Sequence, residues 1–152
     1  MIQRIQTLFL LLSLSFCLLL MYLPLGHVGD QFEFTYYVYG FVDHSGLLVH
    51  SFYLSIVVLL VVIFLQLISI LLYKNRLRQV MLAQISLILL VLLAVSVLMS
   101  PDLFGYPQKD LGLSLEYNWN TILMIIPWGF TYLAIRRIKK DEALVRSADR
   151  MR

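Results

Sequence analysis

Histidine and carboxylate side chains gather in one short segment of the sequence. All three histidines, His27, His44 and His50, lie there, with Asp30 and Asp43 close by. Imidazole and carboxylate groups together bind zinc and other divalent metals. The spacings between the histidines, 17 and 6 residues, match no metal-binding motif. We therefore predict solvated histidines, no metal and no cofactor, with metal or haem ligation as the weaker alternative.

The rest of the sequence offers little catalytic chemistry. Cys17 is the single cysteine, so a disulfide-exchange reaction that needs a cysteine pair is excluded within one chain. No nucleophile has a base and an orienting residue at a recognisable spacing, and no glycine-rich loop could hold a phosphate. These absences predict a protein that is not an enzyme and for which no small-molecule substrate is identified.

The last 17 residues, 136–152, carry seven basic and three acidic side chains. Leu144, Ala148 and Met151 follow a helical spacing that gives one narrow apolar face, and Glu142 with Arg146 forms a possible i,i+4 ion pair. Such a helix would dock on a membrane partner or anchor to anionic lipid, and its modest net charge beside apolar sequence argues against nucleic acid. The candidate docking residues are Arg136, Arg137, Lys139, Lys140, Glu142, Leu144, Arg146, Ala148 and Met151.

Composition indicates which elements must position these groups. The chain has 152 residues, of which 61% are hydrophobic and 14% charged, and these fractions exclude a soluble domain. Apolar runs at about 7–25, 51–73, 79–99 and 119–135 are each long enough, or nearly so, to cross a bilayer. We therefore predict a single all-α membrane domain, residues 1–152, built as a four-transmembrane-helix bundle with a C-terminal helix in the cytoplasm.

The basic residues are distributed unevenly between the connecting segments. Eleven of the twelve lysines and arginines fall at the N-terminus, in the turn near Arg76 or in the tail, and only Lys109 lies elsewhere. The positive-inside rule places both termini in the cytoplasm and segments 26–50 and 100–118 outside. The outer segments carry six carboxylates and one lysine, a net charge of −5. We expect a multi-pass membrane protein with this orientation.

Inside the predicted spans the informative residues are polar but uncharged. If the second and third spans form a hairpin, Ser69 lies opposite Gln84 and Gln66 lies opposite Ser86, so the four could form interhelical hydrogen bonds. In the fourth span, Pro127 lacks an amide hydrogen and stands two residues before Gly129, which predicts a kink.

The two outer segments differ in composition. Segment 26–50 is rich in aromatic and β-branched residues, which predicts a strand or short hairpin, a small β-like loop outside the membrane. Segment 100–118 contains Pro101, Gly105, Pro107 and Gly112, which predicts turns.

Three stretches give the sequence a family resemblance. They are Met1 to Thr7, the turn Tyr73-Lys74-Asn75-Arg76 and, above all, the ending Ala134 to Arg152 with its Lys-Asp-Glu-x-Leu-Val-Arg-Ser-Ala-Asp-Arg pattern. The chain resembles an uncharacterised four-span inner-membrane family of the Bacteroidota, domain-of-unknown-function family 4293. The resemblance implies a multi-pass protein of a bacterial inner membrane with the same architecture, and it favours docking by the tail, but it implies no activity.

These features lead to three functional hypotheses. The first is a non-enzymatic accessory or assembly subunit of a larger membrane complex, with anionic lipid and a membrane protein as partners. The second is a carrier for lipid or a small apolar molecule, with its site between the kinked fourth span and the second and third spans. The third is an extracytoplasmic enzyme that uses the histidine and aspartate residues at a metal site.

Overall fold

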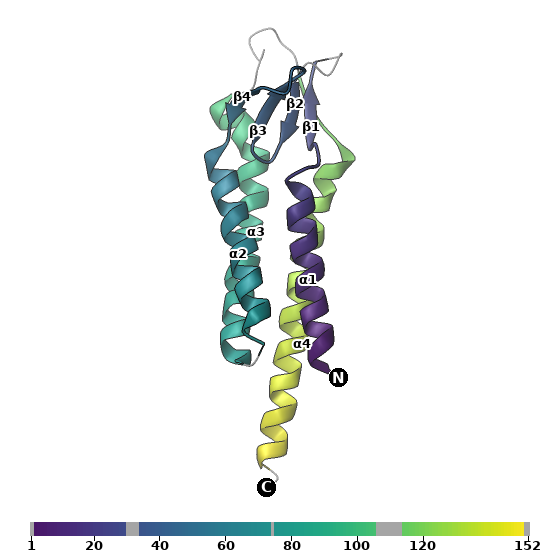
Figure 1. Ribbon diagram of the computed structural model, residues 1–152, viewed down its shortest axis with the longest axis vertical. Helices are drawn as coiled ribbons and strands as arrows, with labels where there is room; N and C mark the ends of the chain where they lie inside the picture. The colour runs from purple at the N-terminus through teal and green to yellow at the C-terminus, as the bar shows by residue number, and fades with distance from the viewer. Residues whose placement is uncertain (1, 30–33, 74, 106–113, 151–152) are drawn as a thin grey trace.

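The computed structural model describes residues 2–29, 34–73, 75–105 and 114–150 (Figure 1). Within them the helices are α1 (Ile2–Leu20), α2 (Tyr53–Leu71), α3 (Arg76–Phe104) and α4 (Ile125–Arg150), with a 3-10 helix, η2 (Trp119–Met124), before α4. The strands are β1 (Gly26–Val28), β2 (Phe34–Tyr37), β3 (Gly40–Asp43), β4 (Leu48–Ser51) and β5 (Leu115–Tyr117).

The helices form a long bundle, and the strands cover one end of it (Figure 1). We call this the sheet end. The opposite end, where α1 begins and α4 finishes, we call the basic end because the described lysines and arginines lie there. In the bundle, α1 packs along α4 and α2 packs along α3, as expected for two helices joined by a short turn.

The predicted all-α fold class is wrong. The strands form a five-stranded antiparallel sheet in the order β4-β3-β2-β1-β5. The strand or hairpin expected in segment 26–50 is present but extends to four strands. The last strand comes from segment 100–118, where only turns were predicted, and it pairs His27 of β1 with Glu116. A strand of three residues is too short for alternation of polar and apolar side chains to reveal it.

Helix α3 is longer than predicted because it continues through Pro101. Proline has no amide hydrogen, so the carbonyl oxygen of Val97 one turn earlier loses its helical donor. The hydroxyl group of Tyr36 donates to this oxygen at 2.6 Å, and the hydroxyl of Ser100 donates at 3.2 Å. These two donors explain how the helix tolerates a proline that on its own suggests a turn.

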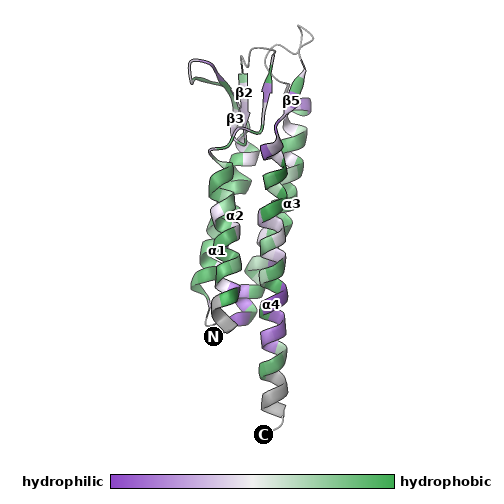
Figure 2. Ribbon diagram, turned by 90° about the vertical axis from the view of Figure 1, so that its right-hand side faces the viewer, coloured by the Kyte–Doolittle hydropathy of each residue, from purple (hydrophilic) through white to green (hydrophobic). Residues whose placement is uncertain are grey.

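Among the described residues, three helical stretches are long and apolar enough to cross a membrane, namely Tyr53–Leu71, Arg76–Leu103 and Trp119–Val145. The apolar stretch of α1, Ile5–Leu20, is shorter. Its helix ends before the predicted residue 25 because Pro24 disfavours helix at the residue before it, and β1 begins at Gly26. The four predicted spans thus lie on four helices, α1 and α2 with 19 residues each, and hydrophobic residues predominate along the part of each that lies in the bundle (Figure 2).

The sheet packs on the helices through an aromatic core. Tyr36 and Phe41 are both fully buried, their ring centroids are 4.8 Å apart, and Phe52 contacts both rings edge-on. Close strand packing requires glycine at position 40, where φ is +144° and a Cβ atom would lie 1.9 Å from the carbonyl oxygen of His50. Sheet and helices therefore share one hydrophobic core at this end.

Candidate functional site

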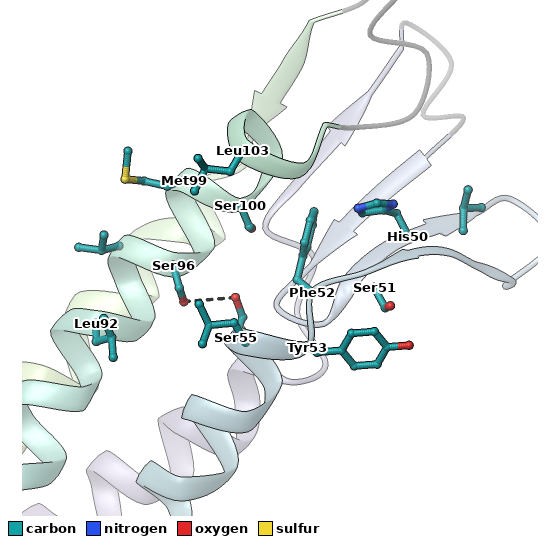
Figure 3. Close-up of a pocket in the computed structure, with 13 residues that line it drawn as sticks. His50, Ser51, Phe52, Tyr53, Ser55, Leu92, Ser96, Met99, Ser100 and Leu103 are labelled. Atoms are coloured by element: carbon teal, nitrogen blue, oxygen red, sulfur yellow. Dashed lines mark hydrogen bonds between the residues drawn. The ribbon is translucent and has the colours of Figure 1, made fainter.

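A cavity of about 580 Å³ opens at the sheet end, between β4, the start of α2 and the last turns of α3 (Figure 3). We call it the outer cavity. Its volume lies within the range of about 300–1,000 Å³ that is typical of small-molecule sites. Most of its lining is apolar, and several lining side chains, among them Leu92, Val95 and Met99, are about half exposed on the helix surface. The cavity is therefore open along the side of the bundle.

The polar groups of the outer cavity are arranged along its length. Leu92 lies at the end nearer the bundle centre, the hydroxyl groups of Ser55 and Ser96 face each other at 3.2 Å, and His50 and Ser51 lie toward the sheet (Figure 3). The His50 ring contacts Phe52 edge-on, with centroids 5.2 Å apart. The cavity is thus apolar toward the bundle centre and carries polar groups among apolar side chains toward the sheet.

Beside the outer cavity, Tyr36 connects the sheet to α3. Its hydroxyl group contacts the Val97 carbonyl oxygen and lies 3.1 Å from the hydroxyl of Ser100, a residue that lines the cavity. Burial raises the pKa of Tyr36 above its ordinary value. Burial and the nearby Asp102 carboxylate raise the pKa of Tyr117 as well. Both phenols therefore remain neutral donors at physiological pH.

The three histidines do not meet. His27 in β1 lies 3.4 Å from the Glu116 carboxylate of β5, His50 is in β4 three strands away, and His44 is in an exposed turn. Adjacent strands are about 4.8 Å apart, so about 14 Å of sheet separates the first two. Among the described residues, no three or more histidine, cysteine or acidic side chains could hold one metal ion. Asp30 lies outside the described residues.

The polar residues predicted to join the second and third spans have other partners. The Gln66 amide donates to the hydroxyl of Ser13 in α1 at 2.8 Å and to that of Thr131 in α4 at 3.3 Å, so the predicted pair with Ser86 is wrong. All three of these side chains are fully buried. The hydroxyl groups of Ser13 and Thr131 in turn donate to the carbonyl oxygen of Pro127. One polar cluster therefore joins α1, α2 and α4 in mid-bundle.

The predicted contact between Ser69 and Gln84 is also replaced by other contacts. Ser69 donates to the Gln79 carbonyl oxygen of α3 at 3.2 Å, and Ser86 donates to Ala83 within its own helix. Gln84 is exposed and lines a second cavity of about 440 Å³ between α3 and α4, together with Lys139 and Glu142.

Pro127 and Gly129 lie in the first turns of α4, directly after η2. A missing amide hydrogen has no cost at the start of a helix, because the first amides have no carbonyl partner within it. The proline thus stands where the chain changes from 3-10 to α-helix, and its carbonyl oxygen serves the mid-bundle cluster.

At the basic end α4 leaves the bundle. Asp141 is 8% exposed, and its carboxylate accepts a hydrogen bond from the Gln6 amide of α1, while its carbonyl oxygen accepts one from Arg76 at 3.5 Å. Beyond it, Leu144 and Val145 are 53% and 46% exposed. The helix passes beyond the neighbouring helix ends here (Figure 1).

Only some of the candidate docking residues have side chains that the structure describes. Arg136, Arg137, Lys139, Lys140, Glu142 and Leu144 lie on α4 within the described side chains. Arg146 and Ala148 are described only as helical backbone, and Met151 lies outside the described residues.

Sequence reasoning missed Tyr36, Ser13, Thr131 and Asp141. A signal existed only for the first: a proline in an apolar helix leaves a carbonyl oxygen that needs a donor, and the adjacent segment is rich in tyrosine. The other three form contacts between residues that are more than 50 positions apart in the chain, which no local pattern indicates.

The architecture is that of a small helical protein with membrane-length helices and a sheet over one end. Within this class the chain belongs to the family described as Domain of unknown function (DUF4293), whose model matches residues 2–151. No curated protein matches the chain.

Proposed function

We propose that this protein is a non-enzymatic accessory or assembly subunit of a larger membrane complex. The observation that carries the proposal is the part of α4 beyond Asp141, which extends past its neighbours and exposes Leu144 and Val145. Nine helical residues, 142–150, add about 13 Å to the bundle. A projecting helix with an apolar pair among charged residues is suited to packing against another protein.

Charge indicates the kind of partner. The tail carries seven basic and three acidic residues, so an acidic surface beside the membrane would complement it. Anionic lipid would also attract the basic cluster, at about 1 kcal/mol for each basic residue near the surface. Lipid binding gives no role to the specific position of Leu144, whereas a protein partner does.

The proposal includes an orientation and a location. We place the protein in a bacterial inner membrane with its basic end on the cytoplasmic side. The arginines and lysines then obey the positive-inside rule, and the sheet lies on the outer side. Tyr22, Tyr53 and Trp119, which are at least 74% exposed, are close to the junction of helices and sheet, where an aromatic belt is expected.

The test compares two variants in native membranes. Leu144→Asp removes the apolar contact, and a fourfold variant with Arg136, Arg137, Lys139 and Lys140 changed to Gln removes the basic cluster. After mild-detergent extraction, native gel electrophoresis with mass spectrometry should show a larger species of constant composition, and Leu144→Asp should release most of the protein as free monomer.

Two results would contradict the proposal. In one, the unaltered protein migrates as a monodisperse monomer without a reproducible partner. In the other, Leu144→Asp has no effect while the fourfold variant alone weakens membrane retention, which would indicate simple lipid anchoring. The control variant Leu77→Asp, at a position that is 57% exposed at the start of α3, should leave the large species intact.

A second function is favoured by the outer cavity, namely binding of a lipid or small apolar molecule. The runner-up hypothesis placed such a site next to the fourth span, but the cavity lies between α2, α3 and β4. A bulky substitution in its lining, such as Val95→Trp, should abolish binding of a hydrophobic fluorescent probe without changing the size of the membrane complex. Apolar-ligand binding and partner docking can therefore be tested separately.

A further inference from the structure

The geometry of the outer cavity points to its occupant: a zwitterionic phospholipid with an ammonium headgroup, one acyl chain of which enters the cavity. This inference rests on the second proposed function, that the cavity binds an apolar molecule, and adds the class of ligand. It is carried by three observations: where the cavity opens, how its polarity changes along its length, and which charges surround it.

The cavity opens where a bilayer would supply the ligand. Leu54 of α2 and Leu92, Val95 and Met99 of α3 line it and are 46–57% exposed on the outside of apolar, membrane-length helices. In a membrane these side chains face hydrocarbon, so water does not fill the open side. An acyl chain from the adjacent leaflet can enter laterally without crossing a polar surface.

The polar groups of the lining begin part of the way along the cavity, as they do in a phospholipid. Along α3 the lining passes from Leu92 to Ser96, whose hydroxyl is hydrogen-bonded to that of Ser55 at 3.2 Å, and then to Met99, Ser100 and Leu103. Farther toward the sheet are His50 and Ser51, which supply hydrogen-bonding groups at headgroup level (Figure 3). An acyl chain would contact the apolar part, and the ester and phosphate oxygens would lie near the histidine and serine.

The charges select the headgroup. The described charged residues at the sheet end are carboxylates, among them Asp43, Glu116 and Asp102, and Asp102 directly precedes the cavity residue Leu103. Every described lysine and arginine lies at the basic end. The outer segments carry a net charge of −5 with Lys109 included, so a net anionic headgroup would meet mainly like charge there. An ammonium group can instead approach the exposed Asp102 carboxylate.

The test uses photoactivatable phospholipids. Full-length protein is reconstituted into vesicles that contain phosphatidylethanolamine or phosphatidylglycerol, each with the same diazirine-bearing acyl chain, and labelled positions are mapped by mass spectrometry. One unit of headgroup charge near a surface corresponds to about a fivefold difference. We expect the ethanolamine probe to label the α2 and α3 cavity segments about fivefold more strongly.

Two valines supply a matched control. Val95 and Val91 lie one turn apart on α3 and are both 48% exposed, but only Val95 lines the cavity. Val95→Trp should reduce labelling of these segments severalfold, and Val91→Trp should leave it unchanged. Asp102→Asn should bring ethanolamine labelling down toward that of the glycerol probe.

The possible failures are distinct. Equal or stronger labelling by phosphatidylglycerol, still sensitive to Val95→Trp, would overturn the headgroup assignment and leave the cavity as an apolar binding site. Labelling that is insensitive to Val95→Trp, or equally sensitive to both tryptophan variants, would overturn the site and the second proposed function together.

Discussion

The hydroxyl group of Tyr36 shows how one side chain can make a helix and a sheet depend on each other. It comes from the middle of the sheet and donates to a carbonyl oxygen that Pro101 leaves without a helical partner. A buried carbonyl without a donor costs about 1–3 kcal/mol. The sheet therefore supplies one of the two donors that make the proline in α3 compatible with the fold.

Removing this hydroxyl gives a first prediction. Tyr36→Phe should lower the free energy of unfolding by about 1–2 kcal/mol, because the hydroxyl of Ser100 alone remains near the Val97 oxygen. In a Pro101→Ala background the restored amide hydrogen can donate to that oxygen, so the same change should cost less. Thermal unfolding of the four proteins in detergent measures this coupling, and an equal cost in both backgrounds would contradict it.

A second prediction concerns alkaline pH. Burial raises the pKa of Tyr36, so the folded protein holds this proton at a pH where the unfolded chain, with tyrosine pKa values near 10, has lost it. This contribution to stability is complete below about pH 10 and decreases as the pH rises further. Tyr39 and Tyr117 are shifted in the same direction.

The unfolding free energy, measured from about pH 8 to about pH 11, should therefore fall at the alkaline end. The fall should be shallower in Tyr36→Phe, which has no proton to lose at this position. An equally steep fall in the variant would assign the effect to other groups.

At the scale of elements, the mid-bundle cluster of Gln66, Ser13 and Thr131 fixes how three helices pack. Hydrogen bonds of this kind have no water to compete with them, and each contributes on the order of 1 kcal/mol in membranes. The cluster also positions Pro127, whose carbonyl oxygen accepts from both hydroxyl groups. The start of α4 is thereby held against α1.

The two glutamines provide a third prediction with an internal control. Gln66 is fully buried and bonded to two other helices, whereas Gln84 is exposed. Gln66→Leu should destabilise the fold by about 1 kcal/mol, and Gln84→Leu should change stability by less than about half of that. Detergent-titration unfolding measures both, and similar values would show that the cluster contributes little.

The parts of these elements that depend on local sequence patterns could be predicted, and the parts that depend on long-range contacts could not. Apolar runs are local, so the helices were predicted in the right order, with starts within about six residues, and the aromatic segment 26–50 indicated strands. The first span was predicted through Pro24, although the helix ends at Leu20. Strand β5 and the continuation of α3 through Pro101 could not be predicted, because each depends on a partner about 60 to 90 positions away. The pairing of Gln66 failed for the same reason, since its partners lie on α1 and α4.

At the scale of the whole molecule, the described basic residues are separated by the length of the bundle from the carboxylates of the sheet end. The described lysines and arginines lie at one end, and the sheet with its acidic residues covers the other. The outer cavity and the projecting part of α4 are therefore at opposite ends. Lipid binding at one end and protein docking at the other would not compete for surface.

This separation yields a fourth prediction, about topology. In a Cys17→Ser background, single cysteines at Leu47 and Asn75 place a thiol at exposed positions on opposite ends. A membrane-impermeant maleimide added to intact cells should label Leu47→Cys alone. Labelling of both positions, or of Asn75→Cys alone, would overturn the proposed orientation, and labelling after permeabilisation shows that both thiols are reactive.

The pairing of β1 with β5 constrains the order in which the molecule can be assembled. Strands β1 to β4 are complete once residue 51 has been synthesised, but the edge of β1 stays open until Leu115–Tyr117 emerges, after α2 and α3. The same holds for α1, whose partner α4 is made last. During synthesis α1 therefore stays without its partner α4, next to a sheet that still lacks β5. Residues 114–150 then supply both β5 and α4.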